Sequence, residues 1–193
     1  MIDISPYLKG VSEDCPQSVI NELRLIKVEY LNFDQDVKSG YLLVHQTLAK
    51  DVQEIFKQLL NIKFLIQMVK PLSDPLFWDD DHWSDELSMQ HNNTCSFNYR
   101  KINGKNKLST HALGMAIDIN PLQNPWVKDD HIIPSNASYD PKAKGTFFKD
   151  SLAVKIFEEK GFFWGGNFNE LKDYHHFERK TKGYEHYFLE KRV

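Results

Sequence analysis

The sequence predicts an α+β domain in which an antiparallel sheet of four or five strands has helices packed on one face and a functional site on the other. The length of 193 residues fits a single domain over 1–193. Short runs rich in β-branched and aromatic residues are separated by polar turns, as in antiparallel sheets. Two further stretches carry apolar residues at helical spacing. We expect the part that carries the chemistry at about 95–180, with the N-terminal strands and helix of 25–70 in the same domain.

The first part of the chain predicts a β-hairpin followed by a helix. Residues 25–31 and 40–45 are strand-like, and the stretch between them is polar and turn-like. A helix is expected from Thr47, because apolar residues then recur at helical spacing and form one stripe. Residues 62–69 are again strand-like.

The composition changes at the segment 72–91, which holds six acidic residues and no Lys or Arg. Its aromatic side chains suggest that it is anchored to the rest of the domain. Two interpretations stay open. The segment is either a solvated acidic loop or a lid over a cleft, since long loops in compact domains are often functional.

The second half predicts shorter strands around one helix. If 95–100 is a strand, Phe97 and Tyr99 lie on one face, and Ser96, Asn98 and Arg100 lie on the polar face. The remaining elements follow from strand-like patterns, turn residues and helical spacing. They are a strand at 115–120, an insertion loop at 124–144, a helix at 147–160 and a strand pair near 162–164 and 174–178.

Charge and apolar content exclude several classes of protein. The 24 Lys and Arg against 27 Asp and Glu give a net charge of −3, unlike a dedicated nucleic-acid binder. No apolar run approaches the about 20 residues of a membrane helix, so no transmembrane segment is expected. Two cysteines are too few for a disulfide framework, and whether Cys15 and Cys95 are bridged stays open.

The stretch 109–121, STHALGMAIDINP, is the first to suggest chemistry. In a strand, Asp118 lies on the face opposite the apolar residues of the core. A carboxylate there is costly unless it is paired or binds a cation. Gly114 and Ala116 keep the neighbouring side chains small, and His111 lies just before the strand across a turn. One His and one Asp are therefore expected to converge.

A second cluster, Asp173, His175 and His176, follows a Trp-Gly-Gly turn. With His111 and Asp118, His176 completes a site of two histidines and one carboxylate, and catalytic zinc uses three protein ligands. A carboxylate three residues before His176 can accept the proton of an attacking water without being a ligand.

The two motifs together resemble the signature of D-alanyl-D-alanine carboxypeptidase-type zinc peptidases, a VanY-like family. The first is S-x-H-x-x-G-x-A-x-D, and the second is D-x-x-H-F-E after the Trp-Gly-Gly turn. The resemblance covers roughly 96–178 and implies the fold shared by these carboxypeptidases and the hedgehog domain. It implies Zn²⁺ held by His111, Asp118 and His176, with Asp173 as the catalytic base.

Arg100 also has a counterpart in the family, where an Arg after a Tyr binds the developing oxyanion or holds the substrate. Only ten residues separate Arg100 from His111 here, a shorter spacing than relatives usually have. A surface or ion-paired arginine is the alternative. Ser109, Asn98 and Trp164 are the further residues expected to contact substrate.

The resemblance implies a zinc-dependent peptidase that cleaves D-amino-acid-containing peptides of peptidoglycan, as a carboxypeptidase or an endopeptidase. A zinc-bearing binding module without peptidase activity is one alternative, and a metal-dependent phosphoesterase is another. The expected partners are peptidoglycan or its fragments and no nucleic acid, and the protein is expected to be a monomer. The substrate suggests the cell envelope or the extracellular space. No signal peptide is visible in the first ten residues, which leaves the cytoplasm open.

Overall fold

A long β-hairpin organises the N-terminal half of the protein. In the computed structural model, which describes residues 3–188, β1 (Leu23–Leu31) and β2 (Val37–His45) pair antiparallel over their whole length. The short helix α1 (Gln17–Glu22) precedes β1. The hairpin predicted from the sequence is confirmed, because β-branched and aromatic residues fill both strands and a polar turn separates them.

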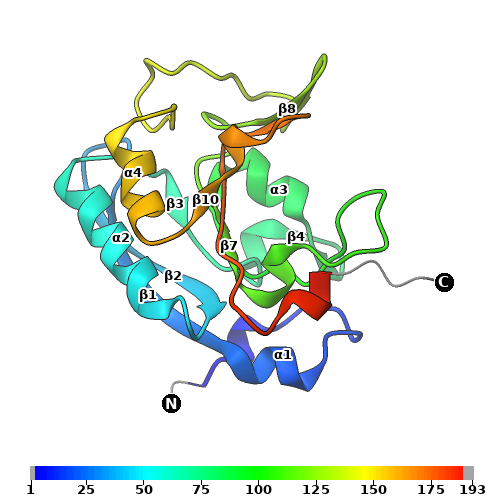
Figure 1. Ribbon diagram of the computed structural model, residues 1–193. Coiled ribbons are helices and arrows are strands. Elements are labelled where there is room, and N and C mark those ends of the chain that lie inside the picture. The colour runs from blue at the N-terminus through cyan, green and yellow to red at the C-terminus, as the bar shows by residue number, and fades with distance from the viewer. Residues whose placement is uncertain (1–2, 189–193) are drawn as a thin grey trace.

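Two amphipathic helices cover this hairpin and the core (Figure 1). α2 (Ala49–Asn61) packs along β1 and buries the apolar stripe that predicted it, including Ile55 and Phe56. α4 (Leu152–Glu159) lies beside α2. The Ser151 hydroxyl caps its first turn by accepting a hydrogen bond from the Val154 amide.

A three-stranded antiparallel sheet crosses the centre of the molecule in the order β10, β12, β7. Its pairing register places His176 opposite Asp118. Met115, Ile117 and Ile119 are fully buried in the core, as their alternation predicts. The strands of this sheet are β7 (Ala116–Asp118), β10 (Phe163–Trp164) and β12 (His176–Glu178).

The prediction of one sheet with four or five strands was wrong in detail, although the fold is mixed α+β. Residues 3–188 form five small sheets of two or three strands each. β7 ends early because Asn120 adopts a φ of +49° and donates its side-chain amide to the carbonyls of Leu65 and Gly145. Such side-chain bonds replace the strand-to-strand bonds that would extend the ladder.

Two of the predicted strands are shorter than expected. Of 62–69, only β3 (Met68–Val69) is a strand, and it pairs in parallel with β6 (Asn93–Thr94). Residues 95–100 form no regular strand but still bind their neighbours through the backbone. Cys95 exchanges two hydrogen bonds with Asp118, and the Asn98 amide donates to the carbonyl of His111.

Both predicted loops contain regular structure. The acidic segment 72–91 forms a short hairpin followed by the helix α3 (Asp85–Gln90). The insertion 124–144 contains a hairpin, and β11 joins it as a third strand. The elements of these regions are η2 (Pro75–Phe77), β4 (Trp78–Asp79), β5 (His82–Trp83), β8 (Trp126–Lys128), β9 (His131–Ile133) and β11 (Lys172–Asp173).

Short 3₁₀ turns complete the described chain: η1 (Ser5–Tyr7), η3 (Thr110–Leu113), η4 (Gly165–Asn167) and η5 (Glu185–Phe188). None of the helices within 3–188 has the length and apolar character needed to cross a bilayer. Cys15 and Cys95 are both buried free thiols, so they are not bridged to each other.

Candidate metal centre

His111 is placed by the tight turn η3 at the entrance to β7. The Ser109 hydroxyl accepts a hydrogen bond from the His111 amide, and Gly114 ends the turn with a φ of +64°. A Cβ atom at Gly114 would come within 2.8 Å of the His45 amide nitrogen, so the backbones approach too closely for a side chain there. The His111 Nδ1 donates to the Ser96 carbonyl at 2.6 Å, which leaves Nε2 to face Asp118.

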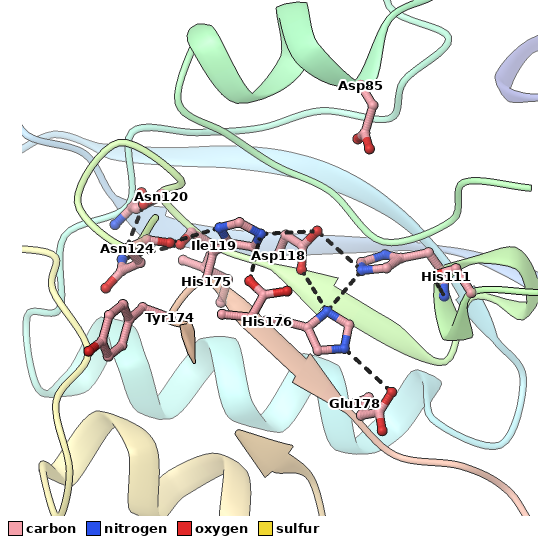
Figure 2. Close-up of polar contacts among 12 residues, drawn as sticks. Asp85, His111, Asp118, Ile119, Asn120, Asn124, Tyr174, His175, His176 and Glu178 are labelled. Atoms are coloured by element: carbon pink, nitrogen blue, oxygen red, sulfur yellow. Dashed lines mark hydrogen bonds and ion pairs between the residues drawn. The ribbon is translucent and has the colours of Figure 1, made fainter. Parts of the chain in front are cut away.

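Asp118 and His176 meet because they are paired across two neighbouring strands. One carboxylate oxygen of Asp118 lies 3.0 Å from His176 Nδ1, and the other lies 3.1 Å from His111 Nε2. The two imidazole nitrogens are themselves 3.1 Å apart. Figure 2 shows the three side chains directed at one point.

This arrangement fits a zinc ion. The three residues are buried, and each offers one ligand atom within 4.8 Å of the others. Zinc bonds of about 2.0–2.1 Å in tetrahedral geometry separate ligand atoms by about 3.3 Å. The observed separations of 3.0–3.1 Å are close to that value. Two imidazoles and one carboxylate are also a ligand set typical of catalytic zinc, with a fourth position left for water.

The electrostatics of the cluster favour a positive charge at this point. Burial raises the pKa of Asp118, but His111 and His175 outweigh it and hold that pKa well below its usual value. Burial lowers the pKa of His176, whereas hydrogen bonds with Asp118 and Glu178 raise it to about 10. Asp118 is therefore charged, and a divalent cation that binds here would displace the protons that His176 holds.

Glu178 supports His176 from the other side of its ring. Its carboxylate lies 3.5 Å from His176 Nε2, so His176 can donate there and keep Nδ1 free for a metal. A carboxylate behind a metal-binding imidazole fixes its orientation and raises its basicity. No role for Glu178 was predicted from the sequence. The signal was available, because Glu178 follows His176 by two positions and shares its face of β12.

Asp173 reaches the edge of the cluster from β11. Its carboxylate lies 2.9 Å from His175 Nε2, and His175 Nδ1 donates to the Asn124 carbonyl at 2.7 Å. A Cβ atom at Gly165 would lie only 2.5 Å from the Asp173 carbonyl oxygen, so the Trp-Gly-Gly turn allows this close packing.

His175 is buried beside the cluster but is held away from its centre. Its Nε2 lies 3.9 Å from Asp118, farther than either His111 or His176. Burial lowers its pKa, and Asp173 and Asp118 raise it to about 9. The geometry thus gives His175 a contact with Asp173 and keeps it distinct from the three residues that converge.

Arg100 forms an ion pair with Asp85, which is the alternative to a contact with substrate that the sequence left open. Its Nε lies 3.1 Å from a carboxylate oxygen of Asp85, the first residue of α3. Its side chain is about one-third exposed. The ion-paired alternative is therefore observed, and a role toward substrate stays a prediction.

The other three residues expected to contact substrate are all buried. Ser109 caps the turn that carries His111, and the Trp164 indole donates to the Tyr174 carbonyl within the core. Asn98 lies beside His111 through its backbone amide. The positions of Ser109 and Trp164 favour structural roles, and their contact with substrate stays a prediction.

Comparison with known proteins agrees with the motifs. The family model described as D-alanyl-D-alanine carboxypeptidase matches residues 103–179. This segment contains the three converging residues as well as Asp173 and Glu178, whereas Asp85 and Arg100 lie outside it. Searches of curated proteins and of solved structures gave no match. The match confirms the resemblance seen in the sequence: residues 103–179 carry the pattern of the VanY-like D-alanyl-D-alanine carboxypeptidase family of peptidases.

Proposed function

We propose that the protein is a zinc-dependent peptidase that hydrolyses peptide bonds in peptidoglycan-type substrates containing D-amino acids. The observation that carries this proposal is the convergence of His111, Asp118 and His176 on one point, inside the segment that matches the peptidase family. Peptidoglycan or its peptide fragments are the proposed partners, so the proposed site of action is the cell envelope or the extracellular space.

The proposed zinc ligands are oriented by their neighbours in the protein. When bound, zinc supplies an electrophile for the scissile carbonyl and lowers the pKa of a water molecule. His111 and His176 present the nitrogen that faces Asp118, because their other nitrogens are engaged by the Ser96 carbonyl and by Glu178. These outer contacts fix the rings before the ion arrives.

Asp173 is the proposed general base. His175 holds one of its carboxylate oxygens, which leaves the other to accept a proton from the attacking water. The same carboxylate would return that proton to the leaving amine. Arg100 is proposed to steady the oxyanion or the terminal carboxylate of the substrate.

Digestion of purified peptidoglycan and of defined muropeptides tests this function. We expect new amino groups and product masses that identify one cleaved bond, with activity lost in a chelator and restored by zinc. Zinc binding without any cleavage would support a binding module instead. Hydrolysis of phosphate esters without peptide cleavage would point to the phosphoesterase alternative.

A further inference from the structure

The acidic segment 72–91 is folded against the domain next to the metal centre. The Ser84 hydroxyl caps α3 by accepting from the Leu87 amide, and the Ser84 amide donates to the carbonyl of the buried Phe77. At the other end of the helix, the side-chain amide of Asn93 donates to the Ser88 hydroxyl. These bonds fold the segment on itself, and Trp83 attaches it to the domain by packing edge-on against the ring of the buried Phe97, with ring centroids 6.4 Å apart.

Asp85 projects from this segment toward the cluster. Figure 2 shows its carboxylate extending from α3 in the direction of Asp118 and His111. Cys95, which exchanges two backbone hydrogen bonds with Asp118, is buried in one cluster with Phe77 of this segment.

Arg100 is tied to the metal centre through the backbone. Its carbonyl accepts from the Ser109 amide, and two residues earlier the Asn98 amide donates to the His111 carbonyl. The strip that carries Arg100 therefore runs beside the turn that carries the first proposed zinc ligand. A shift of this strip would shift Arg100 and His111 together.

The contact between Asp85 and Arg100 occupies only part of the guanidinium group. Asp85 meets it at Nε, at 3.1 Å, and no other partner of the guanidinium is found within residues 3–188. A guanidinium carries five N–H donors in a rigid plane, so its remaining edges can still receive a carboxylate or an oxyanion. About one-third of the Arg100 side chain is exposed to solvent.

We propose that Asp85 is a positioning residue, which holds Arg100 beside the metal centre so that its free N–H groups receive the negatively charged oxygen of the substrate. The inference rests on the proposed peptidase function and deepens it, because it gives the acidic segment a task in recognition of the substrate. Asp85 itself contacts neither the substrate nor the metal.

The test compares initial rates of amino-group release from purified peptidoglycan for wild type, Asp85→Asn, Arg100→Gln and the double variant. We expect Asp85→Asn to lower kcat/KM by about 10-fold and Arg100→Gln by about 10- to 10³-fold. The double variant should be no slower than Arg100→Gln alone, because Asp85 acts only through Arg100. Asp85→Glu should recover most of the rate, since it keeps the carboxylate.

Matched controls separate this task from general effects of charge and folding. Asp81→Asn removes the same charge from an exposed position of the same segment and should leave kcat/KM unchanged. Zinc content and the unfolding midpoint should match the wild type in every variant. A merely structural ion pair would lower the unfolding midpoint and leave the rates alone.

The outcomes distinguish the positioning role of Asp85 from the proposed peptidase function. Two results would overturn the positioning role while the peptidase function stands. One is a wild-type rate in Asp85→Asn. The other is that Asp85→Asn lowers kcat/KM by the same factor whether residue 100 is Arg or Gln. A wild-type protein that binds zinc but releases no amino groups would refute the peptidase function, and with it this inference.

Discussion

Loss of Asp173 should lower the hydrolysis rate and spare zinc binding, unlike loss of the three converging residues. Asp173 lies at the edge of the cluster, where His175 contacts it, and it is not among the residues that converge. We predict that Asp173→Asn keeps zinc and loses about 10²-fold or more of the hydrolysis rate, because an amide cannot accept the proton. Zinc content and peptidoglycan cleavage measured on one preparation check this. Loss of zinc in the variant would make Asp173 a ligand instead.

Loss of the Glu178 carboxylate should weaken zinc binding more than it slows hydrolysis. Burial raises the pKa of Glu178, but its hydrogen bond with His176 lowers it to about 2, so the carboxylate stays charged at neutral pH. We predict that Glu178→Gln weakens zinc binding by about 10- to 100-fold, as loss of a carboxylate behind a metal-binding histidine typically does. Competition against a chelating dye measures it. Glu170→Gln is the control, and equal affinities in both variants would contradict the role.

The sequence alone predicted the positions of those residues that lie in a regular local pattern. Strand alternation and the turn at Gly114 predicted that His111 and Asp118 converge, and the structure brings them within 3.1 Å. The contact between Asp85 and Arg100 could not be predicted in this way. It joins a helix to an irregular strip fifteen positions further along the chain, and neither segment has a repeating pattern that fixes its direction.

At the scale of elements, the turn before β7 carries a conformational requirement that can be tested. Gly114 has a φ of +64°, and an added Cβ would lie 2.8 Å from the His45 amide nitrogen in β2. We predict that Gly114→Ala lowers the free energy of unfolding by more than the about 1–2 kcal/mol that left-handed backbone costs an alanine. Urea denaturation measures it.

Gly104 supplies the matched control for that prediction. Its φ is +73°, but no atom lies within 4 Å of the position a Cβ would take. Gly104→Ala should therefore show the backbone cost alone. Equal destabilisation by the two substitutions would contradict the prediction, because it would mean that the close approach of β2 to Gly114 adds nothing to the cost of the alanine side chain.

The hairpin and the helices α2 and α4 were predictable because each repeats its pattern over many residues, although α4 begins at Leu152 and not at the predicted position 147. α2 shows its stripe over several turns, and β1 pairs with β2 over nine positions. The short strands of the other sheets could not be predicted, because a strand of two or three residues is too short to show an alternation of apolar and polar side chains. Their ends depend on side-chain bonds such as those of Asn120, which form only once distant segments meet.

At the scale of the whole molecule, the two thiols report on the integrity of the core. Burial raises the pKa of Cys15 to about 11, and burial together with the charges of Asp118 and Asp85 raises that of Cys95 well above its usual value. Raised values leave little thiolate at pH 8, and the thiolate is the reactive form. We predict slow labelling by a thiol reagent in the native protein and rapid labelling of both after denaturation. Rapid native labelling of Cys95 would contradict its buried position.

One zinc ion is expected where His111, Asp118 and His176 converge, and elemental analysis of purified protein measures it. We predict one zinc per chain in the wild type and in a His82→Ala, His131→Ala control, which removes two exposed histidines. We predict almost none in the His111→Ala, His176→Ala double variant, because one carboxylate cannot hold the ion alone. Full zinc occupancy in that double variant would contradict this prediction.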